Sequence, residues 1–62
     1  MQPLHTANNQ RHTLAELAGH CEQVEQHARA AASALRHGRI ITARDAVAAA
    51  AIIMKHLERY MA

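Results

Sequence analysis

The residues best suited to chemistry in this chain are its histidines, of which there are six among 62 residues. His12, Glu16 and His20 follow one another at four-residue spacings, so they would share one face of a helix. Zinc is bound in proteins by imidazole and carboxylate groups. His27 lies two turns beyond His20, too far to bind the same ion unless a second copy of the chain contributes. A metal-binding bundle is therefore one alternative function, with the candidate ligands His12, Glu16, His20 and His27.

The chain has a single cysteine, Cys21, and it lies within a stripe of apolar residues. We expect this side chain to be buried as a small hydrophobic group. His20 precedes it, but adjacent residues of a helix do not face each other, which argues against a Cys–His nucleophile. No Ser–His–Asp set, phosphate-binding loop or cysteine pair is present. We therefore expect no enzymatic activity and no cofactor.

Basic residues exceed acidic residues slightly, giving a formal net charge of +2. A surface that binds nucleic acid needs several phosphate contacts and groups that read or stack on bases. Glutamates at positions 22, 25 and 58 interrupt the basic residues, and Tyr60 is the only aromatic residue. Solvated helix faces explain most of these charges. Nucleic-acid binding is the first alternative function, with the candidate residues Arg29, Arg36, Arg44, Lys55 and Arg59.

The elements that would position these residues are indicated by apolar residues that recur at alternating three- and four-residue spacings. In the first half they are Leu14, Leu17, Cys21, Val24, Ala28, Ala31 and Leu35. In the second half they are Ile40, Ala43, Val47, Ala50, Met54, Leu57 and Met61. This spacing is typical of helices that pack as in a coiled coil.

Capping signals set the expected limits of the first helix. Thr13 and Glu16 have the types and spacing of a capping box, in which each side chain accepts a hydrogen bond from the backbone of the other residue. Gly38 can adopt the left-handed conformation that ends a helix. We predict a polar N-terminal tail over residues 1–12 and a helix over about residues 14–37.

A second capping box, Thr42 to Asp45, predicts a turn over about residues 38–42 and a helix over about residues 43–61. In this arrangement Ile41 precedes the cap and packs back onto the helix as a hydrophobic staple. A helix that begins near Arg39 and includes Ile40 in its apolar stripe is the alternative. In both cases residues 13–62 form one domain.

The predicted core is too small for a stable monomer. The chain has no Phe or Trp, and many stripe positions are alanine, each of which buries little apolar area. Small domains that have neither disulfides nor metals usually associate. We expect an all-α fold, an antiparallel two-helix hairpin that dimerises into a four-helix bundle. Apolar residues in and beside the second stripe form the predicted dimer interface: Ala46, Ala49, Ala50, Ile53, Met54, Leu57 and Tyr60.

Over residues 13–61, the two heptad helices, the tight turn and the alternating core sizes resemble the Rop type of dimeric RNA-binding helical hairpin. This resemblance implies a four-helix bundle and is the basis of the nucleic-acid alternative. The exposed Phe that helps that family hold RNA has no counterpart here, because the chain contains no Phe.

The expected function is a small interaction module or regulator, such as an inhibitor of a larger protein, that acts as a homodimer. Candidate partner-binding residues lie opposite the second stripe: Ile41, Ile52, Arg44, Lys55 and Arg59. The longest apolar run, residues 46–54, is far shorter than the roughly 20 residues that span a bilayer, and no signal peptide is evident. We therefore expect no membrane association and a cytoplasmic protein. The pattern leaves open the identity of the partner and the orientation of the dimer.

Overall fold

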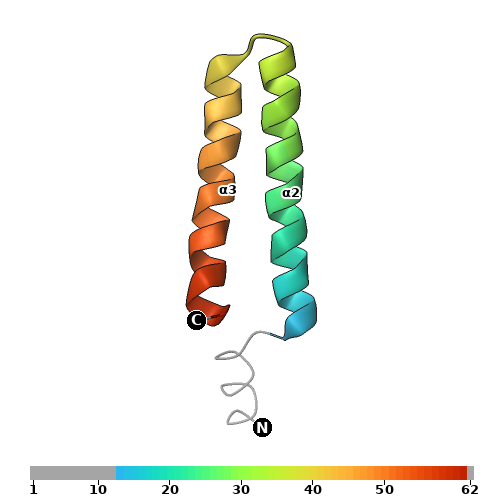
Figure 1. Ribbon diagram of the computed structural model, residues 1–62, viewed down its shortest axis with the longest axis vertical. Coiled ribbons are helices and arrows are strands. Elements are labelled where there is room, and N and C mark those ends of the chain that lie inside the picture. The colour runs from blue at the N-terminus through green and yellow to red at the C-terminus, as the bar shows by residue number, and fades with distance from the viewer. Residues whose placement is uncertain (1–12, 62) are drawn as a thin grey trace, which may run out of the picture.

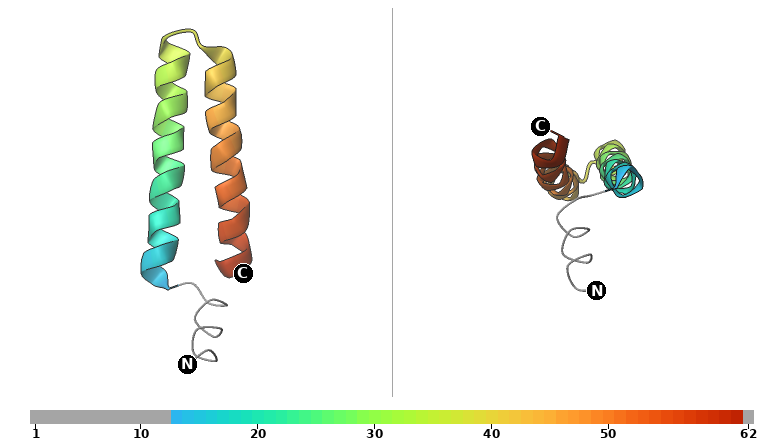
Figure 2. Two further views of the ribbon diagram at one scale, coloured as in Figure 1. Left: turned by 180° about the vertical axis from the view of Figure 1, so that it is seen from behind. Right: turned by 90° about the horizontal axis from the view of Figure 1, so that it is seen from below.

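The computed structural model describes residues 13–61, which form two helices that run antiparallel to each other (Figure 1). Helix α2 spans Leu14–Arg36 and helix α3 spans Ile40–Met61. Seen from behind and along their length, the helices form a single layer (Figure 2). The predicted all-α hairpin is confirmed, and the predicted tail at residues 1–12 lies outside the described residues.

Helix α2 begins where its sequence predicts. Thr13 is the N-cap, and its Oγ1 accepts a hydrogen bond of 3.1 Å from the backbone N–H of Glu16. In return, Glu16 Oε1 accepts a 3.0 Å hydrogen bond from the backbone N–H of Thr13. Two donors that the helix itself cannot satisfy are thus paired.

Helix α2 ends at Arg36, and Gly38 adopts the predicted left-handed conformation just beyond its C-cap. Gly38 has φ of +71°, a conformation that costs glycine nothing and other residues roughly 1–2 kcal/mol. The N–H of Arg39 donates to the carbonyl of Ala34 at 2.8 Å, and the N–H of Gly38 donates to the carbonyl of Leu35 at 3.0 Å. These two hydrogen bonds form a Schellman motif, which satisfies the last carbonyls of α2 and turns the chain sharply.

Helix α3 begins earlier than the main prediction of about residue 43. It starts at Ile40, so residues 40–42 belong to the helix and the connection is only His37–Arg39. The N–H of Ala43 donates to the carbonyl of Arg39 at 3.0 Å, so Arg39 is in the N-cap position immediately before the helix. Thr42 is therefore inside the helix and does not cap it. The Schellman motif explains the difference, because it already redirects the chain and leaves no longer turn for Thr42 to close.

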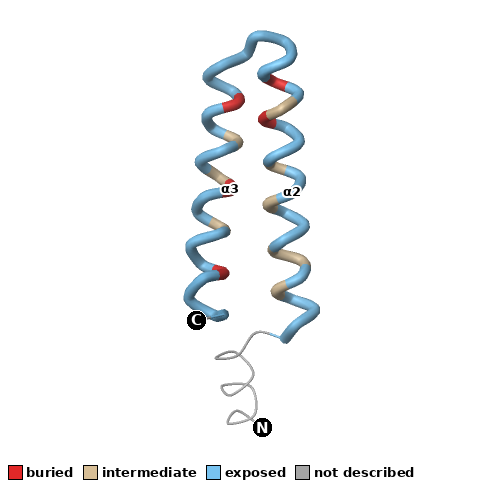
Figure 3. The backbone as a smooth tube through the Cα atoms, viewed as in Figure 1, coloured by how far each residue is buried: buried red, intermediate tan, exposed pale blue. Residues whose placement is uncertain are grey.

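The two helices contact each other along one stripe of each (Figure 3). On α2 the buried or half-buried side chains of this stripe are Leu17, His20, Val24, His27, Ala31 and Ala34. On α3 they are Ala43, Ala46, Ala50, Ile53 and Leu57. Near the turn, the contact is made almost entirely by alanines, which allow the two backbones to approach closely.

Only every second member of each predicted stripe faces the other helix. Leu17, Val24 and Ala31 do so on α2, whereas Cys21 is exposed, so its predicted burial is wrong. The reason is geometric. The residues of a heptad stripe form two columns along the helix, each repeating every seven residues. A helix with one neighbour buries only the column that faces the neighbour, together with residues flanking that column. The other column is left on the surface.

Candidate interaction faces of the hairpin

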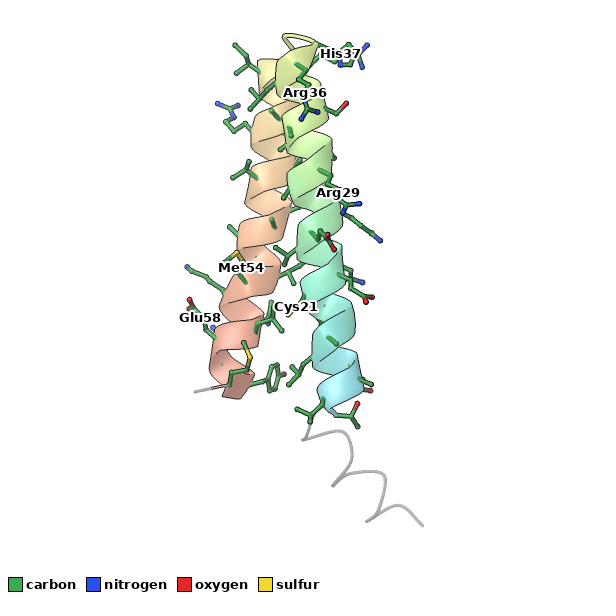
Figure 4. The ribbon with its side chains drawn as sticks, turned by 45° about the vertical axis from the view of Figure 1, so that its right-hand side comes forward. Cys21, Arg29, Arg36, His37, Met54 and Glu58 are labelled. Atoms are coloured by element: carbon green, nitrogen blue, oxygen red, sulfur yellow. The ribbon has the colours of Figure 1, made fainter. Side chains whose placement is uncertain are left out.

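The exposed column of each predicted stripe forms what we call the apolar face. Its members recur at seven-residue intervals on both helices, and all are exposed: Leu14, Cys21, Ala28 and Leu35 on α2, and Ile40, Val47, Met54 and Met61 on α3. In Figure 4, Cys21 and Met54 project from the two helices on the same side of the hairpin. Exposed apolar surface that extends across two elements makes this face a candidate interaction site.

Near the free ends of the helices the apolar face is hollowed. An open cavity of about 270 Å³ is lined by Cys21, Val24, Met54, Leu57, Glu58 and Met61. Glu58 is the one charged residue in this lining, and the rest are apolar or sulfur-containing. Side chains from α2 and α3 thus line one continuous surface, and nothing among the described residues fills the hollow.

Charged residues border the apolar face on both helices. Figure 4 shows Arg29 at the outer edge of α2 and Glu58 at the outer edge of α3. Arg29 Nη2 lies 2.8 Å from Glu25 Oε2, an ion pair between two exposed side chains. An apolar centre with a polar rim is the usual composition of a protein–protein interface.

The residues predicted for the dimer interface divide into two groups. Ala50 and Leu57 are buried against α2, and Ala46, Ala49 and Ile53 are half-buried. Met54 and Tyr60 are exposed, and Met54 lies on the apolar face. Ala50 and Leu57 therefore belong to the core of a single hairpin, while residues such as Val47 and Met61, which the prediction left out, are available to a second chain.

The opposite side of the hairpin, which we call the histidine face, carries one of the predicted metal ligands, His20. His20 and Gln23 from α2 meet His56 and Tyr60 from α3 around a second cavity of about 260 Å³. Spacings along one helix do not indicate His56, because the fold brings this residue from the other helix. This arrangement combines apolar walls with groups that can donate and accept hydrogen bonds.

The predicted metal ligands do not converge within residues 13–61. No group of three His, Cys, Asp or Glu side chains among those residues is placed to hold an ion. The Glu16 carboxylate is used in the cap of α2, and His12 lies outside the described residues. A site of the predicted kind therefore has no complete set of ligands in the described part of one chain.

The candidate nucleic-acid residues are distributed over both helices. Arg29 is paired with Glu25, and Arg36 lies in the last turn of α2. The other three, Arg44, Lys55 and Arg59, are exposed on α3. They do not form one uninterrupted basic surface, because Glu25 and Glu58 lie among them.

Three of the five candidate partner-binding residues, Ile52, Lys55 and Arg59, share a surface on the outer side of α3. Ile52, Lys55, His56 and Arg59 line a shallow hollow of about 110 Å³. Ile52 is 60% exposed and Ile41 is 68% exposed, although both are aliphatic. This outer face combines aliphatic surface with two cations.

No protein-family model, curated protein or solved structure matches this chain. Neither α2 nor α3 combines the length and hydropathy of a bilayer-spanning helix.

Proposed function

We propose that this chain is a small non-enzymatic helical interaction module that acts as a homodimer. In this proposal two hairpins pair through their apolar faces to form a four-helix bundle, and the outer face of α3 binds a larger protein. The observation that carries the proposal is the apolar face itself, with its seven-residue repeat on both helices and its position beside the helix contact.

The small core supports association. Four of the five buried residues in the described chain are alanines, and each removes little apolar area from water. Larger apolar side chains are on the surface, including Val47 at 55% and Met54 at 51% exposure. Pairing two apolar faces would bury these larger side chains, and their burial would supply the stabilisation that the hairpin core lacks.

The heptad pattern supports the same pairing. In a four-helix bundle each helix has two neighbours, and both columns of a heptad stripe are needed to face them. One column already contacts the other helix of the hairpin. A second hairpin is the partner that the remaining column fits, because it supplies two further helices with the same seven-residue spacing.

The outer face of α3 is the proposed binding surface for a larger protein. Lys55 and Arg59 flank Ile52 around the shallow hollow, and none of these three residues belongs to the apolar face. An acidic segment with an aliphatic side chain would complement this surface, the carboxylates pairing with the cations and the aliphatic group covering Ile52.

Two matched variants test the dimer. Val47→Asp places a charge on the apolar face, whereas Ile52→Asp places the same charge at a similarly exposed aliphatic position on the outer face (55% and 60% exposed). We expect light scattering to give a dimeric mass for the wild type and Ile52→Asp, and a monomeric mass for Val47→Asp. A monomeric wild type at high concentration, or equal masses for the two variants, would refute the proposed dimer.

The same Ile52→Asp variant tests the outer face. Purified protein used as bait in nuclease-treated lysate of the native host should retain a specific protein, and Ile52→Asp should lose it while remaining a dimer. In a parallel pull-down without nuclease, retained nucleic acid that elutes with salt, and that is lost in Arg44→Glu, would instead favour the nucleic-acid alternative.

A further inference from the structure

We infer that the second copy docks on the apolar face with its turn over the free helix ends of the first, so that the two turns lie at opposite ends of the bundle. This inference rests on the proposed homodimer and adds the orientation and register of its two chains. The sizes of the side chains on the apolar face and the distribution of charge along the hairpin both favour this arrangement.

The apolar face is organised in four levels along the hairpin. The helices are antiparallel, and the exposed apolar residues of each repeat every seven positions, so each level contains one residue from α2 and one from α3. In agreement with these levels, Cys21, Met54 and Met61 line one hollow. From the free ends to the turn, the levels are Leu14 with Met61, Cys21 with Met54, Ala28 with Val47, and Leu35 with Ile40.

The levels differ in size in a way that discriminates between the two orientations. The end levels are large, the level of Cys21 and Met54 is intermediate, and the level of Ala28 and Val47 is small. With the turns at the same end, the small level would meet its own copy and leave a gap. With the turns at opposite ends, the small level meets the intermediate one and large levels meet at both ends.

Two rigid helix pairs cannot approach more closely at one level than at the next, so the side chains that meet should have a similar total size at every level. The arrangement with the turns at opposite ends comes closer to this condition. It also fixes the register. The small and intermediate levels are adjacent and lie at the centre of the hairpin. All four levels of one copy therefore face levels of the other only when the two copies lie side by side without an offset along the bundle axis.

The charge distribution favours the same orientation. The turn end is basic, with one acidic residue against three arginines: Asp45, and Arg36, Arg39 and Arg44. The free end is acidic, with three glutamates and two basic residues: Glu16, Glu22 and Glu58, and Lys55 and Arg59. Glu25 and Arg29, near mid-length, pair with each other. All nine of these side chains at the two ends are exposed. Opposite ends therefore attract and like ends repel, and such complementarity selects orientation more than it adds affinity.

Cross-linking through the native cysteine tests the register. In the inferred dimer Cys21 lies opposite Ala28 of the second copy, so Ala28→Cys should form disulfide-linked dimers under mild oxidation. The wild type should not, because its two Cys21 residues are about 10 Å apart along the bundle axis, beyond disulfide range. The control C21A/A28C, which retains only the introduced thiol at position 28, should likewise fail to cross-link.

A distance measurement tests the orientation without cross-linking. Ser33 is exposed near the turn, so spin labels on C21A/S33C report where the two turns lie. We expect a separation of at least about 25 Å, whereas turns at the same end would place the labels at one level and much closer. A dimeric mass with a short distance overturns this inference and leaves the proposed function intact, whereas a monomeric mass overturns both.

Discussion

The two glycines of the described chain are in contrasting environments. Gly38 has a positive φ in the turn, where any other residue is strained, whereas Gly19 lies within α2 with open space around the position of a Cβ. Glycine is thus required at position 38. At position 19 it only lowers the stability of the helix, since glycine is a poor helix former.

Alanine substitutions at the two glycines should therefore have opposite effects. We expect Gly38→Ala to lower the free energy of unfolding by about 1–2 kcal/mol and Gly19→Ala to raise it by up to about 1 kcal/mol. Urea denaturation followed by circular dichroism measures both, at one protein concentration so that association contributes equally. A stabilised Gly38→Ala would contradict the Schellman motif.

Two threonines provide a second residue-scale comparison. Thr13 caps α2, so Thr13→Ala should cost about 1 kcal/mol of unfolding free energy. Thr42 lies within the first turn of α3, so Thr42→Ala should change stability by less than about 0.5 kcal/mol. Equal losses in denaturation experiments would mean that α3 begins at the capping box and not at Ile40.

At the scale of the elements, the sequence predicts both helices and the turn glycine, since these depend on local signals. Thr13 with Glu16, Gly38 and the heptad spacing each act within a few residues. The start of α3 could not be predicted in the same way, because a valid capping box at Thr42 competes with the turn geometry set by Gly38. Local signals do not rank these alternatives.

The face that each helix buries was also beyond the sequence. A heptad stripe has two equivalent columns, so Leu17 and Cys21 are indistinguishable as core residues until the position of the neighbouring helix is known. The same holds for His56, which joins His20 only through the fold. Sites built across two elements need the arrangement of those elements, which spacing along one helix does not contain.

Ala50 tests the observed contact between the helices. It is 8% exposed and faces α2, so Ala50→Asp would bury an unpaired charge and should abolish most of the helical circular dichroism signal. Ala48→Asp, at an exposed position on the same helix, should retain that signal. If both variants kept their helicity, α3 would be turned differently from the structure described here.

At the scale of the whole molecule, stability should depend on protein concentration, because in the proposed dimer a hairpin with an alanine-rich core would gain much of its stabilisation from association. We expect the Tm to rise by about 10 °C for each hundredfold increase in concentration. Thermal melts of the wild type at several concentrations measure this slope. Val47→Asp should melt at a lower temperature that does not change with concentration, and a slope equal to that of the wild type would contradict the role of the apolar face.

The turn at His37–Arg39 has a consequence for how the chain folds. Closing so short a connection costs little chain entropy, and it brings the small alanines of both helices together immediately beside it. Contacts local in sequence form quickly, so we expect the hairpin to close from the turn toward the free ends on a microsecond timescale. Amide hydrogen exchange should correspondingly be slowest near Ala34 and Ala43 and fastest toward Leu14 and Met61, where the helices open first.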